Sequence, residues 1–449
     1  MAKVGTKLTK EQRAICDEGV DYLRDESNAE LLIQGAAGTG KTTLAIDLVK
    51  ALVEALSQDY GEAYSVILTA PTHKAVEVLA NNRIATDKQS LLFCTLHSAL
   101  NITYNIDEET GAECFIRDNE SKEDKLSGAT LLVIDEASML GTELLKYIET
   151  SLQNNPLLKI IYLGDIKQLP PINEASSPIF RKGIKTLELK EIVRQATDNP
   201  IIKLSTQPTL INDYKPHLVS SVGDLTIGYT YTNDERSIIR HFACHRNDTE
   251  IRYLAYTNKC VNDFNRRVRS EMYHRPHRVE IGETIIFNRP YVVSSNELYN
   301  NNEEVKIETL DDTIYTLRYP TNKKGGTNIR EFKCYIANDE LPILHEESID
   351  DFIEFTSYLK QRALVKRILW KDYYDVLNSF ISFKHRYAMT IHKAQGSTYH
   401  EVFLDLDNIR TNDRADEREK LLYTAITRAS ERLIIFTKNR NYVSTNIPF

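Results

Sequence analysis

Eight residues near the N-terminus have the types and spacing of a phosphate-binding loop. Residues 35–42 have the sequence GAAGTGKT, which matches the pattern G-x-x-x-x-G-K-[ST]. Glycines let backbone N–H groups curl around a phosphate, the lysine reaches the β- and γ-phosphates, and the hydroxyl that follows binds Mg²⁺. The sequence therefore predicts a site for ATP and Mg²⁺. Its predicted nucleotide contacts are Gly35, Gly38, Thr39, Gly40, Lys41, Thr42 and Thr43.

Two acidic residues follow an apolar run later in the chain. The run 131–134 is Leu-Leu-Val-Ile, and Asp135 and Glu136 come directly after it. Open parallel sheets bind their ligands at the carboxyl ends of strands. We expect Asp135 to hold Mg²⁺ through water, and Glu136 to polarise the water that attacks the γ-phosphate. A strand ending in Asp-Glu can also simply cap a helix, but the phosphate loop upstream favours the catalytic interpretation.

Short apolar runs and helices must position these residues. The runs are continuous and are followed by Gly, Pro or a charge, which is typical of strands buried on both faces of a parallel sheet. They are 31–33, 66–68, 131–134 and 160–163. Leucines recur every four residues between 44 and 56, which indicates a helix covering that sheet. We predict an α/β domain over about 8–178.

A second α/β region is split by an insertion. It covers about 179–275 and 384–449, and its apolar runs are 252–256, 402–404 and 433–436. Between the two parts, residues 276–345 are rich in Asn, Thr, Tyr and β-branched residues, which predicts a small β module. Residues 347–380 have a helical pattern. Residues 101–128 are polar and acidic, and we expect a hairpin or arm there.

The composition excludes several classes of protein. The chain has 449 residues, a net charge of −8, 41% hydrophobic and 27% charged residues. This is a globular mix, and it excludes a polybasic protein although not a locally basic groove. Six cysteines without a C-x-x-C pair indicate reduced thiols and not zinc ligands. With no apolar run of about 18 residues and no signal peptide, we expect a cytoplasmic protein with no membrane partner.

Three further blocks complete an ordered set of motifs. They are GDIKQLPP at 164–171, TIHKAQGST at 390–398 and LYTAITRA at 422–429. With the phosphate loop and the DEAS block at 135–138, this set resembles the motifs of superfamily 1 helicases. The nearer resemblance is to the RecD-like branch, and within it to the Dda-type enzymes of phages. The motifs extend from Gln12 to Arg428, whereas 101–128 and 276–383 match only in placement and rough character.

The resemblance implies an α/β fold with two RecA-like parallel-sheet domains and ATP in the cleft between them. It divides the chain into a first domain (1–95 and 129–178), a pin insertion (96–128), a second domain (179–275 and 384–449), and an SH3-like β module with a helical tower (276–383).

The resemblance also assigns roles in the cleft. Gln12 would recognise the adenine edge, since an amide both donates and accepts. Gln168 would sense the γ-phosphate, and Gly396 would lie near the nucleotide. Arg194 and Arg428 would reach the γ-phosphate from the second domain, which makes hydrolysis depend on cleft closure. The alternatives are a surface polar residue for Gln12, a helix cap for Gln168 and surface ion pairs for the arginines.

By the same resemblance, a path for single-stranded nucleic acid crosses both domains. Hydroxyls, amides and a few cations suit a backbone grip that does not depend on sequence. The expected contacts are Pro71, Thr72, His73, Thr95, His97, Thr390, His392 and Lys393. Phe115, or else Tyr104, would stack on a base in the pin, although Phe115 could instead pack the arm on its own domain. Two basic clusters, 266–278 and 360–371, are either on the path or solvated helix faces.

The predicted function is an ATP-dependent DNA helicase that moves 5′ to 3′ on single-stranded DNA and separates forked duplexes. The direction comes from the resemblance alone. The alternatives are an enzyme of opposite polarity or one acting on RNA, a translocase that remodels complexes without unwinding, and a nucleotide switch. The resemblance also implies a monomer in phage replication or recombination, in the host cytoplasm, with a single-strand-binding or replisome protein as a further partner.

Overall fold

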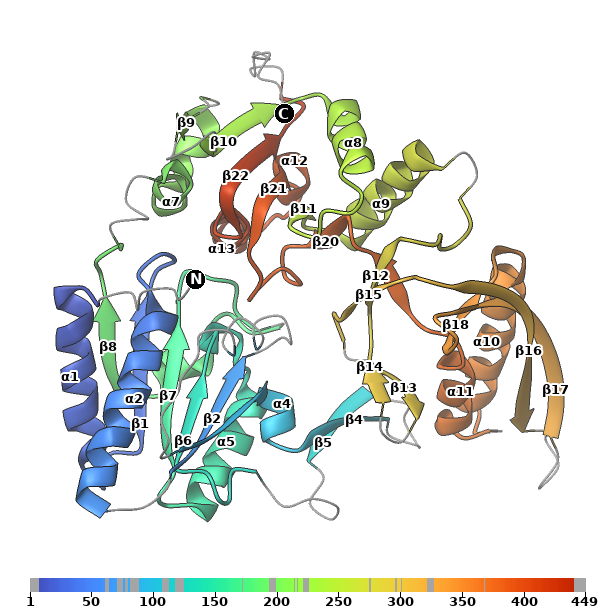
Figure 1. Ribbon diagram of the computed structural model, residues 1–449. Helices are drawn as coiled ribbons and strands as arrows, with labels where there is room; N and C mark the ends of the chain where they lie inside the picture. The colour runs from blue at the N-terminus through green and yellow to red at the C-terminus, as the bar shows by residue number, and fades with distance from the viewer. Residues whose placement is uncertain are drawn as a thin grey trace.

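The computed structural model arranges the chain as two α/β domains with a β-rich insertion beside them (Figure 1). The residues it describes are 8–60, 64–70, 76, 80, 89–106, 113–117, 125–171, 173–193, 199–213, 215, 217–220, 226–273, 276–294, 297–299, 301–320, 327–366 and 368–439. Within these ranges, no helix has the length and apolar character needed to cross a membrane.

The first domain is built on a six-stranded sheet in which every pairing is parallel. The strand order is β3-β2-β6-β7-β1-β8. The strands are β1 (Glu30–Gly35), β2 (Tyr64–Ala70), β3 (Gln89–Thr95), β6 (Leu131–Ile134), β7 (Lys159–Gly164) and β8 (Lys185–Leu189). All residues of β6 and β7 are buried, because helices cover both faces of the sheet. The four predicted apolar runs lie in β1, β2, β6 and β7, which confirms them as strands.

Helices pack on both faces of this sheet. They are α1 (Lys10–Arg24), α2 (Lys41–Tyr60), α4 (Leu96–Ala99) and α5 (Thr142–Asn154), with short 3-10 helices at Ala137–Met139 and Pro178–Arg181. The predicted leucine stripe lies in α2, where Leu44, Leu48, Leu52 and Leu56 are buried in one core with Leu31 and Ile33 of β1. The opposite face buries Leu132 of β6 against Leu145 and Ile148 of α5. The sheet is therefore a rigid platform whose strand ends can hold ligands.

The predicted boundary between the domains at 178 is wrong. β8 pairs in parallel with β1, from Leu31 opposite Lys185 to Gly35 opposite Leu189, so residues assigned to the second domain complete the first sheet. Even Val193 donates its N–H to Gly38 O in the phosphate loop, at 3.0 Å. The strand was missed because β8 is an edge strand, in which only Leu187 and Leu189 are buried, so it has no continuous apolar run.

The second domain also has a six-stranded sheet, in the order β20-β11-β21-β22-β10-β9. Its strands are β9 (His217–Ser220), β10 (Thr226–Thr232), β11 (Ile251–Ala255), β20 (Ala388–Thr390), β21 (Tyr399–Asp405) and β22 (Ala429–Phe436). Only the β9–β10 pairing at the edge is antiparallel. The helices are α7 (Pro200–Thr206), α8 (Glu235–Cys244), α9 (Asn258–Met272), α12 (Leu406–Ile409) and α13 (Ala415–Ile426), with a 3-10 helix at Pro208–Asp213.

Both faces of this second sheet are buried as well. Leu404 belongs to one core cluster and its neighbour Phe403 to the other, as expected for successive residues of one strand. The prediction of two RecA-like parallel-sheet domains is confirmed.

The described residues of the insertion form small antiparallel sheets, two α-helices and a short 3-10 helix at Glu346–Ser348. Three sheets, β15-β12-β19, β13-β14 and β16-β17-β18, are formed. The strands are β12 (Thr284–Phe287), β13 (Tyr291–Ser294), β14 (Glu297–Tyr299), β15 (Glu304–Lys306), β16 (Leu310–Pro320), β17 (Thr327–Ala337), β18 (Leu341–Leu344) and β19 (Phe383–His385). The helices α10 (Ile349–Leu364) and α11 (Trp370–Leu377) bury Phe355 and Val376 against Phe332 of β17. The strands of the β module and the helical segment are confirmed, while the SH3-like character stays a prediction.

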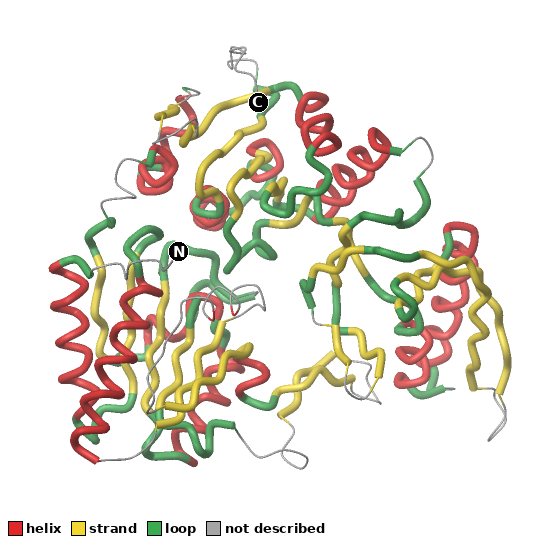
Figure 2. Tube along the Cα trace, in the orientation of Figure 1, coloured by secondary structure: helices red, strands yellow, loops and turns green. Residues whose placement is uncertain are grey.

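The polar arm of the first domain is a hairpin, as expected. β4 (Ile102–Ile106) pairs antiparallel with β5 (Glu113–Arg117), and Tyr104 lies opposite Phe115. In Figures 1 and 2 the hairpin extends from the first domain on the side where the inserted module lies. The predicted pin limits of 96–128 are wider than the hairpin, because Leu96 and Leu126 are buried in the first domain's core.

Candidate nucleotide site and nucleic-acid interface

The phosphate loop connects the end of β1 to the start of α2. Gly38 and Gly40 have φ angles of +82° and +76°, a region that residues with a side chain rarely adopt. A Cβ on Gly40 would also come within 2.6 Å of Gln12 Nε2. The positive φ therefore favours glycine at position 40, and a Cβ there would displace the Gln12 amide. Thr39, whose Oγ1 donates to Ala36 O at 2.9 Å, closes the turn.

The predicted lysine and hydroxyl lie at this loop. Lys41 Nζ donates to the carbonyl oxygens of Gly35 (2.7 Å) and Ala36 (3.2 Å), so the ammonium lies over the loop where a phosphate would bind. Thr42 Oγ1 donates to Asp135 Oδ2 at 3.3 Å, and Thr43 follows in the first turn of α2. α2 and β6 thus bring together two oxygen ligands from distant parts of the sequence. A hydroxyl and a carboxylate side by side fit Mg²⁺, which prefers oxygen ligands.

The two acidic residues after β6 differ in environment. Burial, and secondarily the charge of Glu136, raises the pKa of Asp135 to about 6. Asp135 Oδ1 accepts the Glu136 N–H at 2.8 Å. Glu136 has φ +52° and ψ +43°, a left-handed conformation that is uncommon for a residue with a side chain. Such backbone outliers cost about 1–3 kcal/mol and occur most often at functional sites.

The block after β7 supplies a buried amide and a buried carboxylate. Gln168 donates its backbone N–H to Asp165 O at 3.0 Å, and its side chain is buried. Its Oε1 has no hydrogen-bond partner among the described residues. An unsatisfied buried amide oxygen is costly unless a ligand or water supplies the donor. The position is consistent with the predicted sensor role, which stays a prediction.

Side chains of the second domain reach directly into this site. Tyr423, at the start of the last motif block, accepts the Ala37 N–H of the phosphate loop at 2.9 Å. The same hydroxyl donates to Asp165 Oδ2, so it joins the phosphate loop to the end of β7. Burial and the charge of Asp165 raise the pKa of Tyr423 far above its usual range, so it stays a neutral donor. Tyr423 was not among the predicted site residues, although it lies inside a block that the sequence singled out.

Leu169 is a second contact between the domains that the sequence did not predict. It belongs to the loop after β7, yet its side chain is buried in the second domain's core with Leu421 and Ala425. Residues of the second domain also hydrogen-bond the Leu169 backbone. Leu169 N donates to Thr424 Oγ1 at 3.2 Å, and Gln395 Nε2 donates to Leu169 O at 3.1 Å. An apolar residue between Gln168 and a proline gives no sequence signal for a partner in another domain.

Gln12 joins α1 to the phosphate loop. Its Nε2 donates to Thr39 O at 2.9 Å, and its Oε1 accepts the Thr9 N–H at 3.0 Å. Thr9 Oγ1 in turn accepts the Gln12 N–H at 3.2 Å, which completes a capping box. The side chain is therefore fixed beside the loop, and contact with adenine stays a prediction.

The predicted arginines have different placements. Arg428 is buried and donates to Thr424 O (3.1 Å), Ser397 O (3.0 Å) and Thr427 Oγ1 (3.2 Å), all in its own domain. Gly396, beside Ser397, has φ +73°. Arg194 lies outside the described residues. Contact of either arginine with a γ-phosphate stays a prediction.

The first-domain residues predicted to contact nucleic acid are only partly described. Pro71, Thr72 and His73 lie outside the described residues. Thr95 caps α4 by accepting the Ser98 N–H at 3.3 Å, and burial lowers the pKa of His97 within that helix. Phe115 is placed by its backbone in β5, opposite Tyr104.

On the second domain, three predicted contacts lie together at the end of β20 and directly after it. Thr390 Oγ1 accepts the Lys393 N–H at 3.4 Å. Burial lowers the pKa of His392, whose ring lies 6.3 Å from that of Tyr256. Burial, and then the charge of Lys384, lowers the pKa of Lys393 to about 8.

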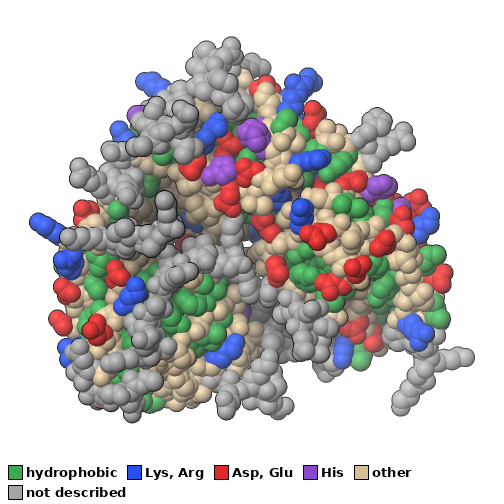
Figure 3. Space-filling model, viewed as in Figure 1, with side chains coloured by type: hydrophobic (Ala, Val, Ile, Leu, Met, Phe, Trp, Pro, Cys, Tyr) green, Lys and Arg blue, Asp and Glu red, His purple; other side chains and the backbone are tan. Residues whose placement is uncertain are grey.

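The basic cluster at 266–278 is largely paired with acids. Arg266 pairs with Asp263, Arg267 with Glu235, and the buried Arg269 with Glu283. On the face shown in Figure 3, described basic and acidic side chains are interspersed. These pairings favour a structural role for this cluster over contact with DNA.

Comparison with known proteins agrees with this arrangement. Residues 7–209 match the AAA domain family, and residues 385–436 match the UvrD-like helicase C-terminal domain. The ATP-dependent DNA helicase Dda of Enterobacteria phage T4 is 26% identical over 435 residues, covering 90% of this chain and 93% of Dda. The RecBCD enzyme subunit RecD of Buchnera aphidicola subsp. Schizaphis graminum is 25% identical over 460 residues, covering 93% of this chain and 72% of RecD.

A solved structure shares the fold. The Pif1 helicase from Bacteroides, in complex with ADP-AlF3 and single-stranded DNA, aligns with a TM-score of 0.51 at 17% identity. The alignment covers 98% of this chain and 94% of the Pif1 chain. Both α/β domains and the ordered motifs are thus accounted for by one group of proteins, and the chain is a superfamily 1 helicase of the RecD-like branch.

Proposed function

We propose that the protein is an ATP-dependent DNA helicase that moves 5′ to 3′ on single-stranded DNA and separates forked duplexes. The observation that carries the proposal is the contact of Tyr423 with Ala37 and Asp165, because it makes the nucleotide site part of the interface between two domains. Hydrolysis at such a site is coupled to domain movement. The relatives named above include DNA helicases. One Pif1 structure is in complex with single-stranded DNA, and another addresses DNA unwinding at forked double-stranded DNA.

The chain's own residues support ATP hydrolysis. Thr42 and Asp135 would hold Mg²⁺, which neutralises charge on the β- and γ-phosphate oxygens when bound. Lys41 would exchange its bonds to the loop carbonyls for the γ-phosphate. Glu136 would orient and polarise the attacking water, and Gln168 would hydrogen-bond the γ-phosphate or that water.

Domain movement would follow from contacts made across the cleft. Arg428 and Arg194 would turn to the γ-phosphate when the domains close, and an arginine in that position stabilises transition-state charge. The backbone of one DNA strand would be held by Thr95 and His97 on the first domain and by residues 390–393 on the second. Each cycle of closing and opening would then move the DNA-binding residues of one domain along the strand relative to those of the other.

The test is strand displacement with ATP and Mg²⁺ on two duplexes, one with a 5′ tail and one with a 3′ tail. Separation of the 5′-tailed duplex alone supports the proposal, and Lys41→Ala should abolish it while leaving DNA binding measurable. Separation of the 3′-tailed duplex alone would reverse the direction. If neither duplex opens while single strands still stimulate hydrolysis, the protein is a translocase that does not unwind.

The setting of this activity is part of the proposal. We expect the helicase to act as a monomer on replicating or recombining DNA in the cytoplasm, and a single-strand-binding protein would be the natural partner on the exposed strand.

A further inference from the structure

We propose that Glu11 is a positioning residue, which fixes the start of the chain connection between the two domains beside the phosphate loop. The connection is residues 190–199, through which the chain passes from β8 of the first sheet to α7 of the second domain (Figure 1). The inference rests on the proposed function, in which DNA bound to both domains moves the second domain and so stimulates ATP hydrolysis.

Glu11 binds the connection with both of its carboxylate oxygens. It lies in the first turn of α1, where Oε1 accepts the Lys190 N–H at 3.1 Å and Oε2 accepts the Glu191 N–H at 2.8 Å. Hydrogen bonds to a charged acceptor are stronger than those between neutral groups. Lys190 and Glu191 are exposed, so water could also satisfy these two N–H groups. The carboxylate therefore contributes less to the stability of the fold than to the direction in which the chain leaves β8.

The same segment continues onto the phosphate loop. Val193 donates its N–H to Gly38 O of the loop at 3.0 Å. A Cβ on Gly40 would come within 3.3 Å of Val193 Cγ2 and 2.6 Å of Gln12 Nε2, so these three residues meet at one point. Gln12 is the neighbour of Glu11 in α1 and donates to the loop as well. One turn of this helix therefore contacts both the phosphate loop and the connection.

The far end of the connection is held by the second domain. Asn199 caps α7, and its Nδ2 donates to Ser430 O of β22 at 3.2 Å. From Val193 to Asn199 the chain has six Cα–Cα steps, which span at most about 20–22 Å. If the connection were free from Leu189 onward, its ten steps would span up to about 33–36 Å. Residues 194–198 lie outside the described part of the chain, and only their number matters. The anchor at Glu11 therefore makes the connection a much shorter tether.

A short tether favours contacts across the cleft. The effective concentration of one domain at the other falls with about the −3/2 power of tether length, so lengthening from six to ten steps lowers it about two-fold. Contacts such as that of Tyr423 with Ala37 would then form less often. Closure of the second domain on the nucleotide would be less frequent, and DNA would stimulate hydrolysis less.

The first test replaces Glu11 with Gln, which removes the charge and leaves one oxygen to accept one of the two N–H groups. ATP hydrolysis is measured with and without saturating oligothymidine. DNA should stimulate the variant about two-fold less than the intact protein, while KM for ATP and the melting temperature stay nearly unchanged. Glu18→Gln is the matched control, since Glu18 of α1 pairs with Lys185 at the start of β8, at 2.7 Å. It joins the same two elements before the connection begins, so stimulation should match that of the intact protein.

A second set of variants tests the length of the tether directly. Four or ten Gly and Ser residues are inserted between Thr197 and Asp198 while Glu11 is kept. Stimulation by DNA should fall about two-fold and about four-fold, and the shorter insertion should match Glu11→Gln. Unchanged stimulation in Glu11→Gln or in both insertion variants would overturn the inference. A rise in KM for ATP with stimulation intact would overturn it too, because Glu11 would then act on nucleotide binding through Gln12.

These outcomes are distinct from failure of the proposed function. If oligothymidine does not stimulate hydrolysis by the intact protein, the helicase proposal itself fails. If it does, and the intact protein unwinds forked DNA while Glu11→Gln behaves identically, only the anchoring role of Glu11 is excluded.

Discussion

Tyr423 places one hydroxyl between two partners that belong to the other domain. It accepts the Ala37 N–H of the phosphate loop and donates to Asp165 at the end of β7. Backbone N–H groups of this loop are the groups that bind phosphate. We therefore predict that nucleotide and tyrosine compete for the Ala37 N–H, and that the position of the second domain depends on which of them binds it.

Replacing Tyr423 with Phe should strengthen ATP binding. The ring remains, but the hydroxyl that competes for the Ala37 N–H is lost, and one hydrogen bond corresponds to roughly two- to ten-fold in affinity. Titration with a fluorescent ATP analogue measures the effect. Tyr162→Phe is the control, because Tyr162 donates to Glu30 in the first domain. Weaker binding by the Tyr423 variant would show that its hydroxyl supports the loop and does not compete with phosphate.

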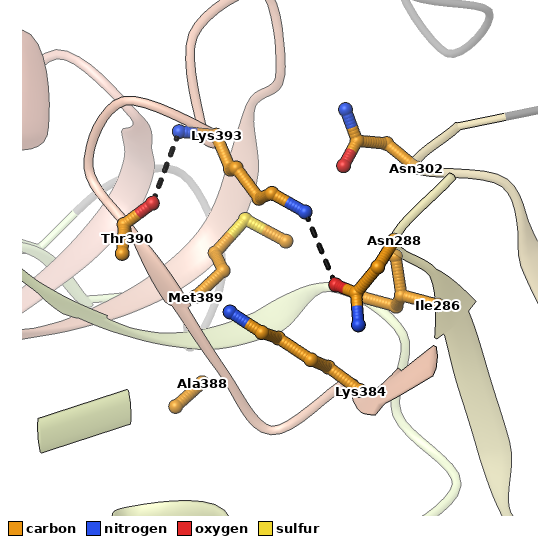
Figure 4. A pocket seen from close by; sticks show the side chains of 8 residues that line it. All are labelled: Ile286, Asn288, Asn302, Lys384, Ala388, Met389, Thr390 and Lys393. Carbon is orange, nitrogen blue, oxygen red and sulfur yellow. Dashed lines mark hydrogen bonds between the residues drawn. The ribbon is translucent and has the colours of Figure 1, made fainter. Parts of the chain in front are cut away.

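Lys393 should make DNA binding depend on pH. With a pKa of about 8, its ammonium is mostly charged at pH 7 and mostly neutral at pH 9. Only the charged form attracts phosphate, so the affinity for oligothymidine should fall as pH rises through this range, by about five-fold for one lost contact. Lys384 lines the same pocket as Lys393 and is the other titratable group among its described residues (Figure 4). Burial lowers the pKa of Lys384 too, so it acts in the same direction.

Lys393→Arg separates the two lysines. Arginine stays charged throughout this range, so most of the pH dependence should disappear. A profile that is as steep in Lys393→Arg as in the intact protein would assign the titration to Lys384 or to another group.

At the scale of elements, the sequence predicted what has a strong local signal. β6 and β7 are buried on both faces, so their apolar runs were recognisable, and the phosphate loop has a distinctive spacing. β8 was missed because an edge strand needs to bury only alternate residues. Leu169 and Tyr423 were missed as contacts between domains, because their partners lie more than 200 residues away in the chain. Local patterns identify strands and loops, but they do not identify tertiary contacts between domains.

Leu169→Ala should uncouple the domains. Truncation would leave a cavity in the second domain's core, which typically costs 2–5 kcal/mol, and loosen the link between Gln168 and that domain. We expect DNA to stimulate the ATPase much less, with a lower melting temperature. Leu158→Ala is the control, because Leu158 is equally buried but within the first domain's core. It should lower the melting temperature while DNA stimulation persists. Equal loss of stimulation in both variants would contradict the coupling role of Leu169.

The β4–β5 hairpin carries a separate prediction. If Phe115 stacks on a base at the fork, Phe115→Ala should reduce strand separation while ATP hydrolysis on single strands continues, since stacking contributes about 1–3 kcal/mol per base. Rates of unwinding and of hydrolysis on the same preparation measure the difference. A parallel fall in both rates would favour packing of the arm on its own domain.

As a whole, the molecule consists of two α/β domains, each built on one six-stranded sheet, with a hairpin and an inserted β module attached to them. The hairpin belongs to the first domain, and the β module with its two helices belongs to the second (Figure 1). We expect ATP to act on the interface between the sheets, and the added parts to contact DNA. Force produced at Tyr423 and Leu169 would therefore reach the fork through rigid sheets.

The pairing of β12 with β19 has a consequence for how such helicases diversify. Phe287 lies opposite Phe383, and Asn288 donates its N–H to Ser382 O at 2.9 Å, so the chain leaves the second domain and returns to it at one point. The residues between them therefore form an inserted cassette whose two ends pair with each other through β12 and β19. Relatives can acquire, enlarge or exchange such a cassette by recombination without changing the strand order of either sheet. Fork preference and affinity for DNA can thus evolve separately from the ATPase that drives them.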